Sequence, residues 1–324
     1  MNVRVWLPNA ISSCTFLSLR LLRNAIMGAE IIDGKKIAET IRAELRPRID
    51  ALRARGVTPG LAAVLVGDNP ASALYVKMKG QACAEMGLHS VTVRLPADAM
   101  TSRLLSEVRQ LNEDPTIHGI LVQQPLPPQI PTIEAVSTVS PGKDVDCFHP
   151  ENVGLLLIGT PRFAPATPVG VVELLLRSGH DPGGKHVVIL GRSNIVGKPL
   201  AALLVQKARG ANATVTVCHS ATRDLRTVTR SADILVAAIG QPEFVTKDMV
   251  RPGVVVIDVG INRIPDVTKK QGYRTVGDVK FNEVREVARA ITPVPGGVGP
   301  MTIAMLLSNT VRASETLREA TRPS

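Results

Sequence analysis

The sequence predicts an α/β protein with two domains, an N-terminal α/β catalytic domain and a Rossmann-type doubly wound domain, with a cleft between them. Two observations support this fold class. Short apolar segments rich in β-branched residues alternate with helical segments along the chain, which is typical of a parallel sheet covered by helices. A stretch rich in Pro, Gly and Asp, from about residue 139 to 168, interrupts this alternation and suits a loop that serves as a domain hinge.

The domain boundaries follow from this interruption. We expect the first domain to span residues 28–166, completed by a C-terminal helix over residues 300–324, and the second to span residues 167–299. Residues 1–27 contain three Arg and no Asp or Glu, and we expect them to lie outside the fold. Their composition suits either an organellar presequence or an upstream start assignment with translation beginning at Met27, and we favour the second.

The bulk composition narrows the class of protein. The net charge of +10 permits a nucleic-acid partner, but aromatic residues make up only 2% and the basic residues are scattered, so we expect no nucleic acid. No apolar run is long enough for a membrane helix, and we expect no membrane. The four cysteines, Cys14, Cys83, Cys147 and Cys218, have no metal-ligand spacing, so we expect no metal site. Their simplest reading is free thiols in a reducing compartment, and we expect a cytoplasmic location.

The elements of the first domain come in alternating order. An amphipathic helix is predicted over residues 35–56, followed by buried strands with helical segments between them, over residues 61–67, 90–96 and 117–123. In the second domain, strands that are apolar on both faces are predicted over residues 186–191, 213–220, 232–240 and 253–260. A Pro/Gly loop over residues 291–300 precedes the last helix.

Lys79 stands out in the segment between the first two strands. Asn69 or Ser72 can cap a helix there and Gly87 can end it. At about 100° per residue, Lys77 shares the solvated face with Gln81 and Glu85. Lys79 falls on the opposite stripe with Tyr75, Ala82, Cys83 and Met86. A lysine in apolar surroundings has its ammonium form disfavoured and suits proton transfer, although one whose head reaches water is the alternative.

Further polar residues are expected near the same crevice. Gln123 ends the third strand, and ligands of open α/β sheets bind at the carboxyl ends of strands. Asp144 and Asp146 lie in the hinge loop, where turn formation is the alternative reading for each. A lysine, an amide and a carboxylate together make a plausible site for acid–base chemistry.

The turn after the strand at 186–191 predicts a dinucleotide site. Gly191, Arg192 and Ser193 open a Gly-bearing turn that leads into a helix, which places a phosphate against backbone N–H groups, although an ordinary strand–helix turn is the alternative. The next strand ends in His219 and Ser220, with no acid to bind a ribose 2′-hydroxyl before Asp224. This pattern favours NADP over NAD; His219 could equally be a plain surface residue.

Seven motifs in order resemble those of bifunctional methylenetetrahydrofolate dehydrogenase/cyclohydrolases. The resemblance runs from about Gly28 to residue 320 and rests on these segments: "VGDNPASALYVKMK", "GILVQQPLP", "KDVDCFHPENVG", "GRSNIVGKPLA", "DVGIN", "VGDV" and "TPVPGGVGPMT".

The resemblance implies NADP-dependent oxidation of 5,10-methylenetetrahydrofolate to the methenyl compound, then hydrolysis to 10-formyltetrahydrofolate in the same cleft, by a homodimer. It implies that Lys79 transfers protons in the hydrolysis, that Tyr75 stacks on the folate, that Gln123 tunes Lys79 and that Asp146 holds the pterin. It further implies that the folate is bound by Pro295, Gly296, Gly297 and Thr302. The NADP contacts implied are Gly191, Arg192, Ser193, Ser220 and Ile261.

The chain departs from the family pattern at Cys147, where Gly is common, at Ala166, where Cys is common, and at Gln124, where Leu is common. We expect Cys147 to affect folate fit, since it follows Asp146. Two rival functions are considered. One is an NADP-dependent dehydrogenase of a small hydroxy or amino acid without hydrolase activity, and the other is a basic nucleic-acid-binding protein.

Overall fold

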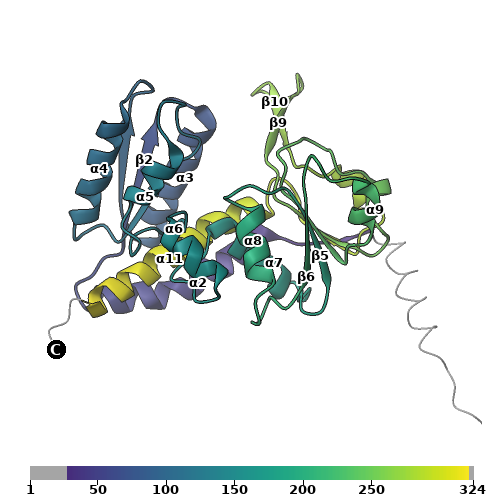
Figure 1. Cartoon of the computed structure of the whole chain (residues 1–324), viewed down its shortest axis with the longest axis horizontal. Helices are drawn as coiled ribbons and strands as arrows, with labels where there is room; N and C mark the ends of the chain where they lie inside the picture. Colours follow the sequence, from purple (N-terminus) through teal and green to yellow (C-terminus); the bar gives the residue numbers. More distant parts are fainter. Residues whose placement is uncertain (1–27, 321–324) are drawn as a thin grey trace, which may run out of the picture.

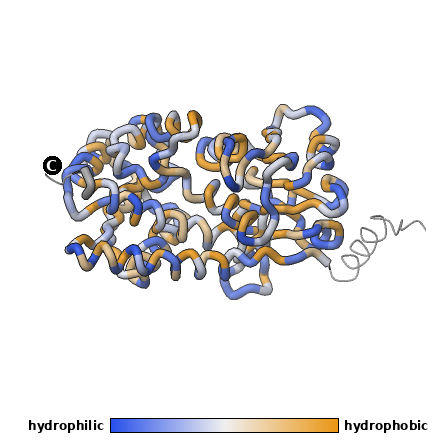
Figure 2. The backbone as a smooth tube through the Cα atoms, turned by 90° about the horizontal axis from the view of Figure 1, so that it is seen from below, coloured by the Kyte–Doolittle hydropathy of each residue, from blue (hydrophilic) through white to orange (hydrophobic). Residues whose placement is uncertain are grey.

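A computed structural model describes residues 28–320 of the chain, with side chains through residue 317. The described chain forms two α/β lobes that are linked by a pair of long helices (Figure 1). Hydrophobic segments run through the interior of both lobes, and hydrophilic ones are frequent in the outer turns (Figure 2). The two-domain α/β fold predicted from the sequence is therefore confirmed.

The first lobe contains a three-stranded parallel sheet in the order β3-β2-β4. Its strands are β2 (Gly60–Val66), β3 (His89–Leu95) and β4 (Gly119–Val122). The accompanying helices are α3 (Pro70–Met86), α4 (Thr101–Glu113) and α5 (Thr132–Thr138). Every residue of β2 is buried, as expected for a central strand covered on both faces.

The second lobe contains a six-stranded parallel sheet in the order β1-β11-β8-β7-β5-β6. Its strands are β1 (Glu30–Ile31), β5 (His186–Leu190), β6 (Thr214–Cys218), β7 (Ile234–Ala237), β8 (Val255–Asp258) and β11 (Ala290–Ile291). The helices and the 3₁₀ turn are α8 (Gly197–Leu204), α9 (Leu225–Arg230), η1 (Lys247–Met249) and α10 (Phe281–Val284). Because β1 pairs with β11, residues 30–31 lie in this sheet and not in that of the first lobe, where the sequence places them.

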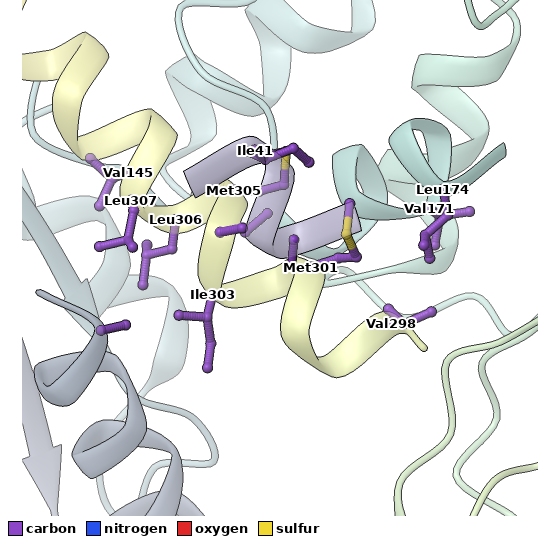
Figure 3. Packing of buried hydrophobic residues seen from close by; sticks show 14 of the residues in the cluster. Ile41, Val145, Val171, Leu174, Val298, Met301, Ile303, Met305, Leu306 and Leu307 are labelled. Atoms are coloured by element: carbon purple, nitrogen blue, oxygen red, sulfur yellow. The ribbon is translucent and has the colours of Figure 1, made fainter. Parts of the chain in front are cut away.

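Two long helices join the lobes. α2 (Gly34–Arg53) and α11 (Val298–Ala320) lie side by side below the first lobe and extend to the second, with α7 (Ala166–Arg177) packed on α11 (Figure 1). Figure 3 shows the buried side chains between them, including Met301, Met305 and Leu306 of α11, Ile41 of α2 and Leu174 of α7. Bidentate ion pairs reinforce this packing, from Arg48 to Glu315 and from Arg177 to Glu44.

Two parts of the chain differ from the expected pattern. The segment at 139–168, expected to be a loop, contains the helix α6 (Pro150–Leu157), which packs on α8. An antiparallel hairpin of β9 (Asn262–Pro265) and β10 (Tyr273–Val276) projects from the second lobe (Figure 1). Strands of four residues with charged members give little apolar alternation, so the hairpin escapes prediction.

Candidate active site

Helix α3 has the start, end and faces expected from the sequence. The side chain of Asn69 accepts hydrogen bonds from the backbone N–H groups of Ala71 and Ser72, at 3.0 and 3.1 Å. Gly87 ends the helix with a φ of 68°, in the left-handed region that glycine adopts readily. Lys77 is exposed, whereas Lys79 is only 8% exposed. The predicted division of the two lysines is confirmed.

Lys79 is held by Gln123. The Nζ of Lys79 donates to the Oε1 of Gln123 at 3.1 Å. The Nε2 of Gln123 donates to the backbone carbonyl oxygen of Gln124 at 2.8 Å, which fixes the amide with its oxygen toward the lysine. Gln123 directly follows β4, so a strand end positions the acceptor and a helix positions the donor.

The two aspartates of the hinge segment have different surroundings. Asp144 is buried and accepts from the backbone N–H groups of Phe148 and His149 at 3.2 and 2.8 Å, and from the Nδ2 of Asn152 at 2.9 Å. Asp146 faces a cavity, and within residues 28–317 its carboxylate has no hydrogen-bond partner. Burial raises the pKa of Asp146, and the positive charge of Lys79 opposes this increase. Asp144 therefore builds the loop, and Asp146 is free to bind a ligand.

Residues from both lobes line one cavity of about 290 Å³. Thr167 and Thr302 bridge α7 and α11 there, with their hydroxyl oxygens 2.9 Å apart. Other lining residues come from α3, from the segments after β4, β5 and β8, and from the start of α11; they include Tyr75, Lys79, Gln123, Asp146, Ile195, Val196, Ile261 and Thr302. The structure thus brings together the predicted catalytic residues and places Thr302 with them.

Tyr75 lies between this cavity and a second one of about 680 Å³. Burial raises the pKa of its hydroxyl, although the nearby charge of Arg263 opposes this increase, so the ring is neutral at physiological pH. Pro295, Gly296 and Gly297 line the larger cavity and not the smaller one. The backbone N–H of Lys35 donates to the carbonyl of Gly296 at 3.0 Å, which ties this loop to the start of α2.

The turn after β5 has the geometry of a phosphate-binding loop. Gly191 has a φ of 115°, and a Cβ there would lie 2.1 Å from the carbonyl oxygen of Ala238. A Cβ on Gly197 would lie 2.0 Å from the carbonyl oxygen of Gly191. The Oγ of Ser193 accepts from the N–H of Val196 at 3.1 Å. The turn therefore packs closely against the segment after β7 and against itself where α8 begins, as two glycines without side chains allow.

A third cavity of about 320 Å³ adjoins this turn. It lies at the point where the strand order reverses between β5 and β7, the usual ligand position in such sheets. Gly191, Arg192, Ser193 and Ser220 line it together with His219, and none of the described lining residues is acidic. Ile261 is apart from this group, in the wall shared by the other two cavities.

Asp258 and Asp278, in the segments "DVGIN" and "VGDV", have a structural role that the sequence did not predict. Asp258 accepts from the N–H groups of Gly260, Asp278 and Val279 at 3.0, 2.9 and 3.0 Å. Asp278 accepts from the N–H groups of Ile239 and Gly240 at 2.7 and 3.0 Å, and from Nδ2 of Asn262. The pair thus fixes the backbone after β7 and β8 beside the cleft. In the sequence, an acid next to Gly at the end of a predicted strand is the pattern that could have indicated this role.

The departures from the family pattern have clear positions. Cys147 has a φ of 60°, in the region where glycine is favoured, and its buried Sγ donates to the carbonyl of Phe163 at 3.2 Å. It does not line the cavity, so the expected effect on folate fit is not supported by its position. Ala166 and Gln124 do line the cavity.

Other expectations bear on the described residues only. Cys83, Cys147 and Cys218 are free and buried, as predicted, while Cys14 and the whole of residues 1–27 lie outside the described part. Within residues 28–320, no helix is long and apolar enough to cross a membrane. The same part of the chain holds no group of three or more His, Cys, Asp or Glu side chains that could bind a metal ion.

Comparison with known proteins decides the family. Residues 32–146 match the model of the tetrahydrofolate dehydrogenase/cyclohydrolase catalytic domain, and residues 165–318 match that of the family's NAD(P)-binding domain. The chain belongs to this family. It is therefore an enzyme with a catalytic and an NAD(P)-binding domain, and the family predicted from the motifs is confirmed.

Similar proteins agree with this assignment. The Bifunctional protein FolD of Prosthecochloris aestuarii is 53% identical over 286 residues, which cover 87% of this chain and 97% of that protein. The crystal structure of the bifunctional methylenetetrahydrofolate dehydrogenase/cyclohydrolase from Campylobacter jejuni is 46% identical, with a TM-score of 0.84, and the match covers 89% of this chain and 99% of that one. The enzyme of the same name from Trypanosoma brucei, complexed with NADP and an inhibitor, is 43% identical with a TM-score of 0.85, and the match covers 91% and 99%. These findings do not favour a dehydrogenase of a small hydroxy or amino acid.

Proposed function

We propose that the protein oxidises 5,10-methylenetetrahydrofolate with NADP and hydrolyses the methenyl product to 10-formyltetrahydrofolate in the same cleft. The observation that carries this proposal is the Lys79–Gln123 pair, bonded at 3.1 Å in the wall of a cavity that Asp146 shares. A dehydrogenase without hydrolase activity has no need of a buried lysine oriented in this way.

The substrate is bound by residues of both lobes in this proposal. Asp146 accepts hydrogen bonds from the N–H groups of the pterin, because its carboxylate has no partner in the described chain. Tyr75 offers its neutral ring as a stacking surface. Thr302, held by Thr167, and the Pro295–Gly297 loop complete the folate site.

The hydrolysis rests on Lys79. Water that adds to the methenyl carbon must lose a proton, and the bond from that carbon to N5 then breaks as N5 takes up a proton, with one proton released overall. Lys79 is the group in the cavity wall that can move these protons. Gln123 occupies one N–H of Lys79 and sets the direction of the others. Gln123 is thus a positioning residue for the proton carrier.

The cofactor site fits NADP. Gly191 and Gly197 allow the close backbone contacts that shape the turn beside the 320 Å³ cavity, where a pyrophosphate would bind. Arg192, Ser193 and Ser220 line this cavity and offer donors to a 2′-phosphate, and none of the described lining residues is a carboxylate that would repel it. When bound, NADP supplies the hydride acceptor for the oxidation. Ile261, in the wall of the smaller cavity, is placed to contact its nicotinamide end.

We propose that the chain has the two domains expected from the sequence, residues 28–166 completed by residues 300–324, and residues 167–299. The two sheets support this division, except that β1 pairs in the second sheet. A homodimer, a cytoplasmic location and the absence of a nucleic-acid partner stay predictions, which sedimentation, cell fractionation and oligonucleotide binding can check.

A spectroscopic assay tests the function. With purified enzyme and 5,10-methylenetetrahydrofolate, the account expects NADP-dependent methenyl formation followed by its decay to the 10-formyl product, and slower formation with NAD. Methenyl formation without enzyme-dependent decay would contradict the hydrolase half. A lack of formation with both cofactors would contradict the dehydrogenase half.

A further inference from the structure

The 680 Å³ cavity beside the Lys79 site is too large to be explained by the reaction centre alone. It adjoins the smaller cavity, and the two share the lining residues Tyr75, Val259, Ile261, Val298 and Gly299. Its opposite walls are one face of the β9–β10 hairpin and the outer residues of α3. A substrate whose reacting end lies at Lys79 would extend past Tyr75 into this cavity.

One face of the hairpin is directed to this cavity. Arg263 lies opposite Thr275 and Pro265 lies opposite Tyr273 in the antiparallel register, so their side chains share a face. Arg263, Tyr273 and Thr275 all line the cavity. The guanidinium carbon of Arg263 lies 4.6 Å from the centroid of the Tyr273 ring, which holds the cation over the aromatic face.

Arg263 has no carboxylate partner within the described part of the chain. Its neighbour Arg274 points to the other face of the hairpin and pairs with Glu243 at 3.3 Å. The acid that lines the cavity, Asp258, is occupied by three backbone N–H groups. The charge of Arg263 also reaches Tyr75 across the cavity, where it opposes the rise in that residue's pKa. An unpaired guanidinium thus faces an open space next to the reaction centre.

The other wall is apolar. Leu74 and Met78 of α3 are 45% and 40% exposed and line the cavity. A folate carries, beyond its pterin, an aminobenzoyl ring and then a glutamyl tail with carboxylates. The apolar wall suits the aminobenzoyl ring, and the free guanidinium on the facing hairpin suits a carboxylate of the tail.

We propose that Arg263 binds a glutamyl carboxylate of the folate substrate, and that the 680 Å³ cavity takes the aminobenzoylglutamate part. This inference rests on the proposed function. It makes Arg263 a specificity-determining residue, which distinguishes glutamylated folates from the same pterin without the tail.

The test compares 5,10-methylenetetrahydrofolate with 5,10-methylenetetrahydropteroate, which lacks the glutamate. In Arg263→Gln we expect the KM for the folate to rise about tenfold with kcat nearly unchanged, since a charge-assisted hydrogen bond is lost. The KM values for the pteroate and for NADP should stay at the wild-type level. In Arg263→Lys, which keeps the positive charge but loses the two parallel N–H donors of the guanidinium, the KM for the folate should lie between those of wild type and Arg263→Gln. Arg274→Gln, on the opposite face of the same hairpin, is the matched control, and it should leave the KM for both substrates unchanged.

A second measurement needs no turnover of the tail-less substrate. Inhibition by p-aminobenzoylglutamate should weaken about tenfold in Arg263→Gln, whereas inhibition by p-aminobenzoate should not change. Equal increases in KM for folate and pteroate, or no increase for either, would overturn the subsite while leaving the proposed function intact. Wild-type enzyme that oxidises neither substrate would instead overturn the proposed function, and the subsite with it.

Discussion

Two pairs of aspartates, one in each lobe, illustrate how burial and function separate. In the second lobe both Asp258 and Asp278 are buried and fully used as acceptors for backbone N–H groups. Of the pair in the first lobe, Asp144 is used in this way, whereas Asp146, two residues later, faces the cavity with no hydrogen-bond partner among residues 28–317. A buried carboxylate therefore indicates a ligand site here only where the protein's own hydrogen bonds leave it free.

Among these aspartates, the largest effect is expected of Asp146→Asn. Removing the free carboxylate takes away a charged acceptor for the substrate, which is worth about 2–3 kcal/mol or roughly 100-fold in kcat/KM for the folate. Steady-state kinetics with the folate varied should show this loss, while the KM for NADP stays near wild type. Unchanged kcat/KM for the folate in Asp146→Asn would show that Asp146 does not bind the pterin.

Asp144→Asn should act on stability. The amide leaves one acceptor oxygen where the carboxylate offers two, so a buried N–H of residues 148–152 loses its partner. We expect the free energy of unfolding to fall by about 2 kcal/mol. Urea unfolding would measure this, with activity per folded molecule within a few-fold of wild type. A hundredfold loss of activity in a fully stable Asp144→Asn protein would reverse the roles of the two residues.

Asp258 should make stability depend on pH. Burial, and to a lesser extent the charge of Asp278, raise its pKa to about 7 from 3.8, although the backbone hydrogen bonds oppose this increase. Between these two values the folded protein keeps a proton that the unfolded chain loses, so the contribution of Asp258 to stability falls as pH rises through this window.

In Asp258→Asn this contribution is absent. The stability of wild type relative to the variant should therefore decrease by about 2–3 kcal/mol between pH 5 and pH 7.5. Thermal or urea unfolding of both proteins over that range measures it. A difference that is constant with pH, or that grows with pH, would contradict the assignment.

Parts of this site could be predicted because separate patterns agreed. Helical spacing separated Lys79 from Lys77, and the end of a buried strand marked Gln123. Residue patterns alone could not separate Asp144 from Asp146, and only the family resemblance singled out Asp146. The distinction depends on which carboxylate the N–H groups of Phe148 and His149 reach. Cys147, which directly follows Asp146, has a positive φ, and nothing in a Cys signals that conformation.

The same reasoning explains what was missed in the fold. The hairpin that presents Arg263 has two four-residue strands with charged members, too short for a periodic signal. Helix α6 lies within a segment whose Pro, Gly and Asp content predicts a loop, and it is stabilised by packing on α8. β1 pairs with β11 from the far end of the sequence, a contact that no local pattern contains.

The central claim is that Lys79, held by Gln123, carries the proton of the hydrolysis. Lys79→Gln and Lys77→Gln, on the buried and solvated faces of α3, should be assayed for decay of the methenyl compound and for its formation. The account predicts that decay falls at least 100-fold in Lys79→Gln, with a much smaller effect on formation, so that the methenyl product accumulates. Lys77→Gln should match wild type. Normal 10-formyl product formation by Lys79→Gln would contradict the account.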